Sequence, residues 1–206
     1  MKKLVLSAAI AIFGLMSVEA QNVNTEALQL GVRAGYNLSN LNGDKIQGVD
    51  TKSLSGFHIG LFTEFPVAPR FSIQPEVIYS TQGSKFEALG KEADLRLQYI
   101  NVPVLAKVYL ANGFNLQAGP QIGFLTGADW KEDGANDVDA TDYLKGTDFG
   151  LLLGAGYKLA QGVTIDARYN MGLSNITDED ASWDENVGIN QDWKNGVFQI
   201  GIGYQF

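Results

Sequence analysis

Apolar residues recur at every second position in eight separate stretches of the chain. The stretches cover 28–38, 57–65, 71–79, 100–110, 114–124, 149–159, 163–173 and 198–206. Polar residues or glycines stand between the apolar positions, as in Leu30-Gly31-Val32-Arg33-Ala34. Successive side chains of a β-strand point to opposite faces, whereas a helix repeats its apolar positions about every 3.6 residues. The pattern therefore predicts eight strands, each with one apolar and one polar face.

The links between these stretches alternate between short and long. Residues 66–70, 111–113 and 160–162 form short links, and residues 39–55, 82–98, 126–147 and 175–194 form long polar ones. Because every second link is long, all long loops lie at one end of the sheet, as in outer-membrane barrels. The stretches also exceed the usual strand of about 5–6 residues and suit tilted membrane-spanning strands. The sequence predicts an all-β protein, an eight-stranded antiparallel transmembrane β-barrel with an up-and-down meander.

The composition of the two faces predicts which of them points outward. The polar face is rich in glycine and carries charges of both signs, which suits the narrow interior of an eight-stranded barrel. The other face is almost wholly aliphatic and aromatic, which suits lipid. The alternative is a soluble lipocalin-like barrel whose apolar face points inward. We expect the polar face to form a lumen charge network of Arg33, His58, Glu64, Glu76, Lys107, Asp148, Lys158, Asp166 and Arg168.

Two further features of the stretches carry expectations. Aromatic residues near the ends of the stretches are expected to form two girdles at the membrane interfaces. Pro75, Pro103 and Pro120 fall inside predicted strands, although proline cannot donate to a sheet ladder. In a closed barrel without free edges, we expect them to mark bulges or local kinks.

The first 20 residues are expected to be a cleaved secretory signal peptide. Lys2 and Lys3 precede a 13-residue apolar run, and Val18-Glu19-Ala20 offers small residues where a signal peptidase cuts. The alternative is a buried N-terminal helix. The run is too short to cross a bilayer as a helix. This interpretation gives a signal peptide at 1–20 and a single barrel domain at 21–206.

The amino-acid composition argues against several classes of protein and of functional site. The net charge of −8 argues against a nucleic-acid partner, because such proteins need a basic face. The chain has no Cys, which excludes disulfides, thiolate metal sites, a Cys nucleophile and a lipid-anchoring Cys. The charged fraction of 18% is low for a soluble protein, and the 24 glycines are many.

Four segments carry a resemblance to a known family. They are Leu30-Gly31-Val32-Arg33-Ala34-Gly35-Tyr36-Asn37-Leu38-Ser39, Ile73-Gln74-Pro75-Glu76-Val77-Ile78-Tyr79-Ser80, Tyr99-Ile100-Asn101-Val102-Pro103-Val104-Leu105-Ala106-Lys107 and Gly119-Pro120-Gln121-Ile122-Gly123. The chain resembles the outer-membrane protein beta-barrel domain family, often labelled "porin family protein", of Bacteroidetes-type bacteria. The resemblance implies an outer-membrane location among lipid and lipopolysaccharide, and no catalytic residues or cofactor. The terminal Phe206 resembles the signal that the barrel-assembly machinery recognises.

Catalysis and transport remain as alternatives to a structural role. His58 is the only His and could be imagined with Ser55 or Ser80 in a hydrolytic site. We expect instead a hydrogen-bonded interior His and no enzyme activity. The inner charges are expected to plug the lumen, and the alternative is a narrow, low-conductance channel for ions or small polar solutes. A lipid-modifying enzyme is the weaker alternative.

Two long loops hold about half of the acidic residues and every Trp. The acidic residues are Asp129, Glu132, Asp133, Asp137, Asp139, Asp142, Asp178, Glu179, Asp180, Asp184, Glu185 and Asp192. Carboxylates bind divalent cations, but Asp178 to Glu185 lacks EF-hand spacing, so a solvated acidic surface is the default. Trp130, Trp183 and Trp193 are candidate contacts for cationic or sugar partners, or interfacial anchors. We expect a structural or interaction protein with acidic extracellular loops.

Overall fold

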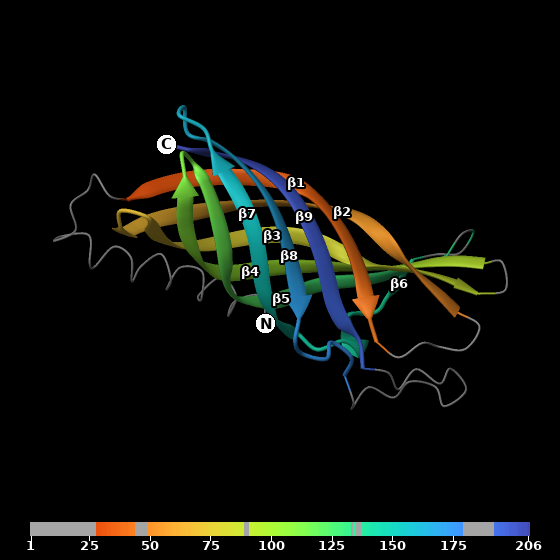
Figure 1. Cartoon of the computed structure of the whole chain (residues 1–206). Helices are drawn as coiled ribbons and strands as arrows, with labels where there is room; N and C mark the ends of the chain where they lie inside the picture. Colours follow the sequence, from red (N-terminus) through yellow and green to blue (C-terminus); the bar gives the residue numbers. More distant parts are fainter. Residues whose placement is uncertain (1–27, 44–48, 89–90, 133, 135–136, 179–191) are drawn as a thin grey trace.

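The computed structural model describes residues 28–43, 49–88, 91–132, 134, 137–178 and 192–206. Within these residues the chain forms nine strands and one 3-10 turn, and Figure 1 shows the strands wrapped around one axis. Their bounds are β1 Gln29–Asn42, β2 Val49–Ala68, β3 Phe71–Ala88, β4 Lys91–Ala111, β5 Phe114–Glu132, β6 Val138–Asp139, η2 Thr141–Tyr143, β7 Thr147–Lys158, β8 Val163–Gly172 and β9 Lys194–Gln205. The predicted signal peptide and the start at Gln21 lie outside the described residues.

Eight of the strands close into a ring of antiparallel neighbours. Strands β1 to β5, β7, β8 and β9 pair in that order, and β1 pairs with β9 from Gly31↔Gln205 to Asn42↔Lys194. The two-residue β6 is an addition that pairs with β5 at Asp129 and Trp130. Ring closure satisfies the backbone hydrogen bonds that a membrane interior cannot. The predicted eight-stranded up-and-down barrel is confirmed.

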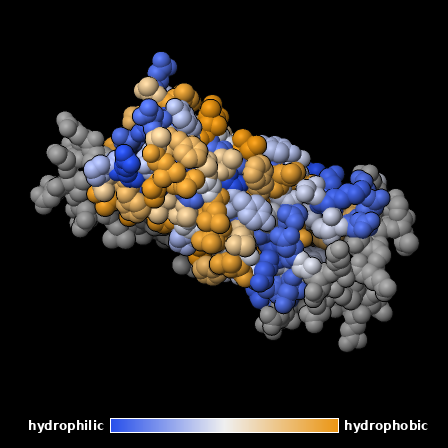
Figure 2. All heavy atoms as spheres, in the orientation of Figure 1, coloured by the Kyte–Doolittle hydropathy of each residue, from blue (hydrophilic) through white to orange (hydrophobic). Residues whose placement is uncertain are grey.

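The wall has an apolar outer face and a polar inner face. On β9, Ile202 is 58% exposed whereas its neighbours on the inner face are buried, including Gln199 and Gln205. Hydrophobic residues cover much of the wall in Figure 2, and hydrophilic residues gather toward the end with the longest strands. A lipocalin-like barrel would show the opposite arrangement, so that alternative is wrong.

Aromatic residues lie at both ends of the apolar wall. Near the long-strand end, Tyr36 pairs with Phe57, whose ring centroid is 6.0 Å from that of Tyr79. Near the short turns, Tyr204 and Phe206 pack edge to face at 5.5 Å. Large amphipathic rings at such positions anchor a barrel between hydrocarbon and water.

Two of the three short links are tight turns that place a glycine in the left-handed region. Gly113, between β4 and β5, has φ +86°, and Gly162, between β7 and β8, has φ +82°. Only glycine adopts this conformation without strain. The turns and the C-terminus share one end of the barrel in Figure 1.

Much of the sequence predicted as long loops is strand. Strands β3 and β4 form one long hairpin that pairs from Phe71↔Val108 out to Ala88↔Lys91, and β2 and β5 flank its outer part. The prediction was wrong because the polarity pattern reverses there. Outside the apolar wall, the outer face carries polar residues such as Arg96, while Leu95 and Leu97 point inward and are buried.

The three strand prolines interrupt the ladders without shifting the register. Between β3 and β4, pairing stops after Pro75↔Val104 and resumes at Ile78↔Asn101 with the same register, which leaves Pro103 unpaired with β3. The β2–β3 ladder has the same gap at Pro75, and the β4–β5 ladder has it at Pro120. The predicted bulges are therefore wrong at these positions, since the register shifts lie elsewhere, and the other expectation, local kinks, stays a prediction.

Candidate functional site: the filled barrel interior

A central ionic cluster joins three strands, β1, β3 and β8, inside the barrel. Arg33 of β1 donates from Nη1 to Glu76 Oε2 of β3 at 3.0 Å and from Nη2 to Asp166 Oδ1 of β8 at 2.7 Å. Arg168 Nη1 donates to both oxygens of Glu76 at 2.9 Å. Arg168 Nε also lies 3.0 Å from Asp166 Oδ1, as an ion pair. Two guanidinium groups and two carboxylates thus neutralise one another.

Glycines opposite these long side chains make room for them. Arg33 stands opposite Gly60 and Gly203, and Arg168 stands opposite Gly154. A Cβ on Gly201 would lie 2.9 Å from Arg33 Nη2 and 3.1 Å from His58 Nε2. The glycine-rich inner face therefore holds the large polar residues without steric conflict.

His58 is held as a neutral imidazole of defined tautomer. Its Nε2 lies 3.3 Å from Arg33 Nη2, which can only donate, so Nε2 accepts. Its Nδ1 then donates to Asn37 Oδ1 at 2.7 Å. Asn37 in turn donates from Nδ2 to Ser80 Oγ at 2.9 Å. With 1% of its surface exposed, His58 belongs to the packed network.

A second cluster continues the network toward the short-turn end. Lys107 donates to Glu64 Oε2 at 3.0 Å and to Gln74 Oε1 at 2.9 Å. Gln74 passes the connection to the central cluster by donating to Glu76 Oε1 at 2.6 Å. The Tyr109 hydroxyl donates to the second carboxylate oxygen of Glu64, Oε1, at 2.5 Å. Seven of the nine residues proposed from the sequence thus form one connected set.

The other two residues stand apart from this set. Lys158 is partly buried and donates to Gln29 Oε1 at 2.7 Å. Asp148 accepts from Ser174 Oγ and Asn195 Nδ2, both at 2.8 Å. The nine residues comprise four bases, four acids and one neutral His, so their formal charge is zero.

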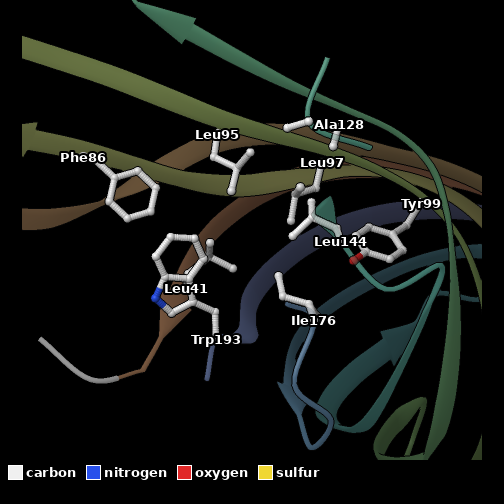
Figure 3. Packing of buried hydrophobic residues seen from close by; sticks show 10 residues of the cluster. Leu41, Phe86, Leu95, Leu97, Tyr99, Ala128, Leu144, Ile176 and Trp193 are labelled. Atoms are coloured by element: carbon white, nitrogen blue, oxygen red, sulfur yellow. The ribbon is translucent and has the colours of Figure 1, made fainter. Parts of the chain in front are cut away.

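A cluster of apolar side chains fills the interior between the ionic clusters and the long-strand end. The sequence analysis did not predict this cluster. It comprises Leu41, Phe86, Leu95, Leu97, Tyr99, Ala128, Ala140, Leu144, Ile176 and Trp193 (Figure 3). Phe86 stacks with Trp130 and with Trp193, with ring centroids 5.4 and 5.3 Å apart. Trp193 is 4% exposed, so both roles considered for it, outside partner and interfacial anchor, are wrong. Trp183 lies outside the described residues.

The interior leaves little free space between the ionic side chains. The cavity that Arg33, Gln74, Lys107 and Arg168 help to line has a volume of about 10 Å³. That volume holds about one water molecule. At the level of these ionic residues, side chains therefore fill the lumen.

The described residues contain no group of three or more His, Cys, Asp or Glu able to hold a metal ion. Some loop acids have other partners: Asp137 pairs with Lys131, and Asp139 accepts from the Thr141 backbone N–H at 2.8 Å. Five of the acidic residues proposed from the sequence, Asp133, Glu179, Asp180, Asp184 and Glu185, lie outside the described residues.

A closed eight-stranded ring with an apolar wall and a charge-balanced interior defines a transmembrane β-barrel. Residues 19–178 match the family described as "Outer membrane protein beta-barrel domain", and the chain belongs to this family. The resemblance seen in the sequence is confirmed, and the protein is an outer-membrane barrel that sits among outer-membrane lipids. The match includes β1 to β8 and leaves out β9, although β9 pairs with both β1 and β8 in the barrel. None of the curated proteins matches the chain.

Solved outer-membrane barrels are similar to the chain at low sequence identity. Neisserial surface protein A is 15% identical with a TM-score of 0.53, over 86% of this chain and 97% of that one. Ail of Yersinia pestis is 18% identical with a TM-score of 0.46, over 87% and 99%. OprG of Pseudomonas aeruginosa is 15% identical with a TM-score of 0.46, over 87% and 96%. The first likeness supports the barrel fold. In the part of the chain that the structure describes, no helix is long and apolar enough to cross a membrane.

Proposed function

We propose that this protein is a non-conducting barrel whose strands outside the apolar wall serve as an interaction surface. The observation that carries the proposal is the interior: a connected network from Arg33 to Lys107 surrounds a cavity of about 10 Å³. The apolar cluster fills the interior beyond the network. A passing ion would have to break buried ion pairs and then cross apolar packing, and both steps are costly.

Conductance across a planar bilayer tests this proposal against a narrow channel. We expect refolded wild-type protein to be silent. Removing charges at the constriction, in a Glu76→Ala/Arg168→Ala double variant, should open a measurable conductance, whereas Lys52→Ala, in an exposed pair, should not. Discrete openings in the wild type that vanish in Lys107→Gln or Arg168→Gln would overturn the proposal and favour transport.

The proposal includes the absence of enzyme activity. It is supported by His58, whose two nitrogens are engaged by Arg33 and Asn37, while the Ser80 hydroxyl accepts from Asn37. Ser55 is exposed and its hydroxyl contacts Tyr36 instead. Lipid-modifying activity in vesicles of outer-membrane lipid should be absent. An activity that His58→Asn abolishes without loss of the folded barrel would contradict this.

The C-terminal residue is proposed as the contact for the barrel-assembly machinery. Phe206 is 71% exposed, and its backbone N–H donates to Leu30 O at 2.8 Å, beside the β1–β9 closure. Phe206→Ala should slow membrane assembly in cells several-fold. Val67→Ala, an exposed apolar residue at the same end, serves as the control. Equal assembly rates would contradict the role.

The acidic loops are proposed to attract divalent cations that bridge them to phosphorylated lipids. The support is their composition, with twelve acidic residues and only Lys131, Lys145 and Lys194 as bases in the two loops. Calcium should raise the midpoint of thermal unfolding, and replacing the six acids of residues 178–192 by amides should remove that shift. An unchanged midpoint in the wild type would contradict the proposal.

A further inference from the structure

Strand β2 begins with a segment that has a strand neighbour on one side only. Residues 49–53 pair with β3, but β1 pairs with β2 no further out than Leu54 in the part of the chain that the structure describes. The side chains of residues 50–53 are exposed, and Figure 1 shows β2 extending past the end of β1. The other edge of this outer sheet is covered, because β6 pairs with β5 at Asp129 and Trp130. Residues 49–53, the β2 edge, thus form an open side of the sheet.

The backbone of Thr51 faces away from β3. The carbonyl of Lys52 accepts from Ser84 Oγ of β3 at 3.0 Å, so it points toward β3. Backbone groups of successive residues in an antiparallel strand point alternately to its two sides. The N–H and C=O groups of Thr51 therefore point to the open side, where a further strand can bind to them.

Like charges face each other where the β2 edge joins β3. Asp50 stands directly opposite Glu87, and Lys52 stands directly opposite Lys85. These side chains share the outer face of the sheet, where Lys52 forms an ion pair with Glu87. Directly opposed like charges destabilise a sheet. Asp50 would therefore gain from a cation on its open side, and Lys52 would gain from an anion.

The β2 edge is complementary in charge to a second copy of itself. When the second copy is placed antiparallel with the two Thr51 residues opposed, Asp50 of each copy lies opposite Lys52 of the other. The two Thr51 residues then exchange both of their backbone hydrogen bonds. Exposed Lys residues usually keep sheet edges apart by repulsion. Here an acid and a base on the same face convert that repulsion into attraction.

An antiparallel partner must point in the opposite direction. Two antiparallel strands of one sheet are related by a half-turn about an axis perpendicular to that sheet. Barrels of one outer membrane all direct their short turns toward the periplasm. Copies in the same membrane therefore cannot form this pair, whereas copies in two facing membranes can.

We propose that the β2 edge pairs with the same edge of a second copy in a facing outer membrane and so links two cells. The inference rests on the interaction role proposed for the strands outside the apolar wall, and it names the partner as a second copy of this chain. A pair of short edge strands buries little surface, so one contact is weak. Many copies in two facing membranes act together and strengthen the link.

Clustering of vesicles tests the proposal. Full-length protein is reconstituted into phosphatidylcholine vesicles that carry one of two dyes, and coincidence of the two dyes is counted by fluorescence. The neutral lipid leaves the protein as the source of charge. We expect about fivefold or more coincidence relative to protein-free vesicles, because many contacts accumulate between two surfaces. Raising the salt concentration should lower the coincidence, since salt screens exposed charge pairs.

Exchange of charges identifies the contact. Asp50→Lys should remove clustering, because its edge then carries two cations that repel those of a second copy. Lys52→Asp should remove clustering in the same way, with two anions. A mixture of the two variants should cluster as the wild type does, because each anion again faces a cation. Glu92→Lys is the matched control: it reverses an acid in the same cross-strand row, opposite Glu87 and away from the edge, and should cluster normally.

Thr51→Pro tests the backbone contribution separately. Proline removes the N–H group that points to the open side but is tolerated on an edge strand, so the barrel should fold while clustering falls to the level of protein-free vesicles. The charges of Asp50 and Lys52 are unchanged in this variant. Heat-modifiable gel mobility first shows that each variant is folded. Clustering of folded Thr51→Pro equal to that of the wild type would contradict strand pairing.

Three further results would overturn the proposal. Coincidence of wild-type vesicles equal to that of protein-free vesicles would leave the β2 edge to a different protein. Self-clustering of Asp50→Lys equal to the wild type would show that these charges do not determine the contact. Absence of clustering in the mixture of folded charge variants would contradict the antiparallel register. The conductance measurement uses a single membrane, so a conducting wild type would overturn the non-conducting barrel without affecting clustering, and the two proposals fail separately.

Discussion

Glycines of strand β5 differ in how closely the neighbouring strand approaches them. A Cβ on Gly119 would lie 1.9 Å from Val104 O, a backbone atom that cannot move aside alone. A Cβ on Gly127 of the same strand would have its nearest neighbours at 3.5 Å, an ordinary contact. Residues of one type on one strand therefore carry different constraints.

We predict that Gly119→Ala lowers the free energy of unfolding by about 1–3 kcal/mol, the usual effect of overpacking. Gly127→Ala should change it by less than about 0.5 kcal/mol. Urea titrations of the folded gel band measure both. If Gly127→Ala lowered the free energy of unfolding more than Gly119→Ala does, this would contradict the close approach of Val104 O to Gly119.

At the ionic cluster, one carboxylate serves two cations. Glu76→Gln keeps the shape but leaves Arg33 and Arg168 sharing Asp166 alone. We predict a loss of about 3–5 kcal/mol in unfolding free energy, as for breaking a buried ion pair. Glu87→Gln breaks the exposed pair with Lys52 and should leave the urea midpoint unchanged. Comparable midpoints for the two variants would contradict the buried role of Glu76.

At the scale of elements, the segment between β5 and β7 is fastened to the wall by side chains near η2. Ala128 N–H donates to Thr141 Oγ1 at 3.0 Å, and Ala140 N–H donates to Ala128 O at 2.9 Å. The Thr141 hydroxyl and backbone N–H both hydrogen-bond to the Asp139 carboxylate and lower its pKa. Asp139 and Thr141 thus connect a surface segment to the edge of the apolar cluster.

The hydrogen bonds between Asp139 and Thr141 predict how the stability of this segment changes with pH. Because the folded-state pKa of Asp139 is lowered, its stabilisation is present above the ordinary Asp pKa and is lost as the pH falls through the lowered value. Hydrogen exchange at Ala128, corrected for intrinsic chemistry, should therefore accelerate at acid pH. Asp139→Asn should show faster exchange at neutral pH and no further change with acid. A wild-type rate that is independent of pH would contradict the role of Asp139.

The elements also show what the sequence could predict. Alternation located all eight wall segments because lipid imposes one rule on every outward position. The rule ends where the strands leave the wall. There the inward side chains are apolar, such as Leu95 and Leu97. In the sequence, the segment 82–98 that contains them has the composition of a polar loop with scattered apolar positions, so the strand was not predicted. Likewise the sequence placed Arg33 and Glu76 on one inner face, but their pairing depends on strand stagger, which local pattern does not contain.

At the scale of the whole molecule, the β1–β9 seam determines whether the ring is closed. Leu38 and Phe198 are direct partners across it, and both point outward. Opposed residues in antiparallel strands have Cα atoms about 4.5–5.5 Å apart, within reach of a disulfide. Because the chain has no Cys, an engineered pair is free of competing thiols.

We predict that Leu38→Cys/Phe198→Cys forms a disulfide on mild oxidation of the folded protein. Leu38→Cys/Ile202→Cys, which mismatches the register by four residues, should not. Mass spectrometry after blocking free thiols measures both. Efficient crosslinking of the mismatched pair would contradict the register, and failure of both pairs in folded protein would contradict seam closure.

The position of Glu76 in the central cluster has a consequence for insertion into the bilayer. Its two cations come from β1 and β8, on opposite sides of the seam, so an open ring cannot supply both at once. A half-assembled sheet would hold uncompensated charge and unpaired strand edges in a medium that tolerates neither. Neutralising the interior and sealing the ring are therefore one event, which makes an all-or-none membrane entry the expected folding behaviour.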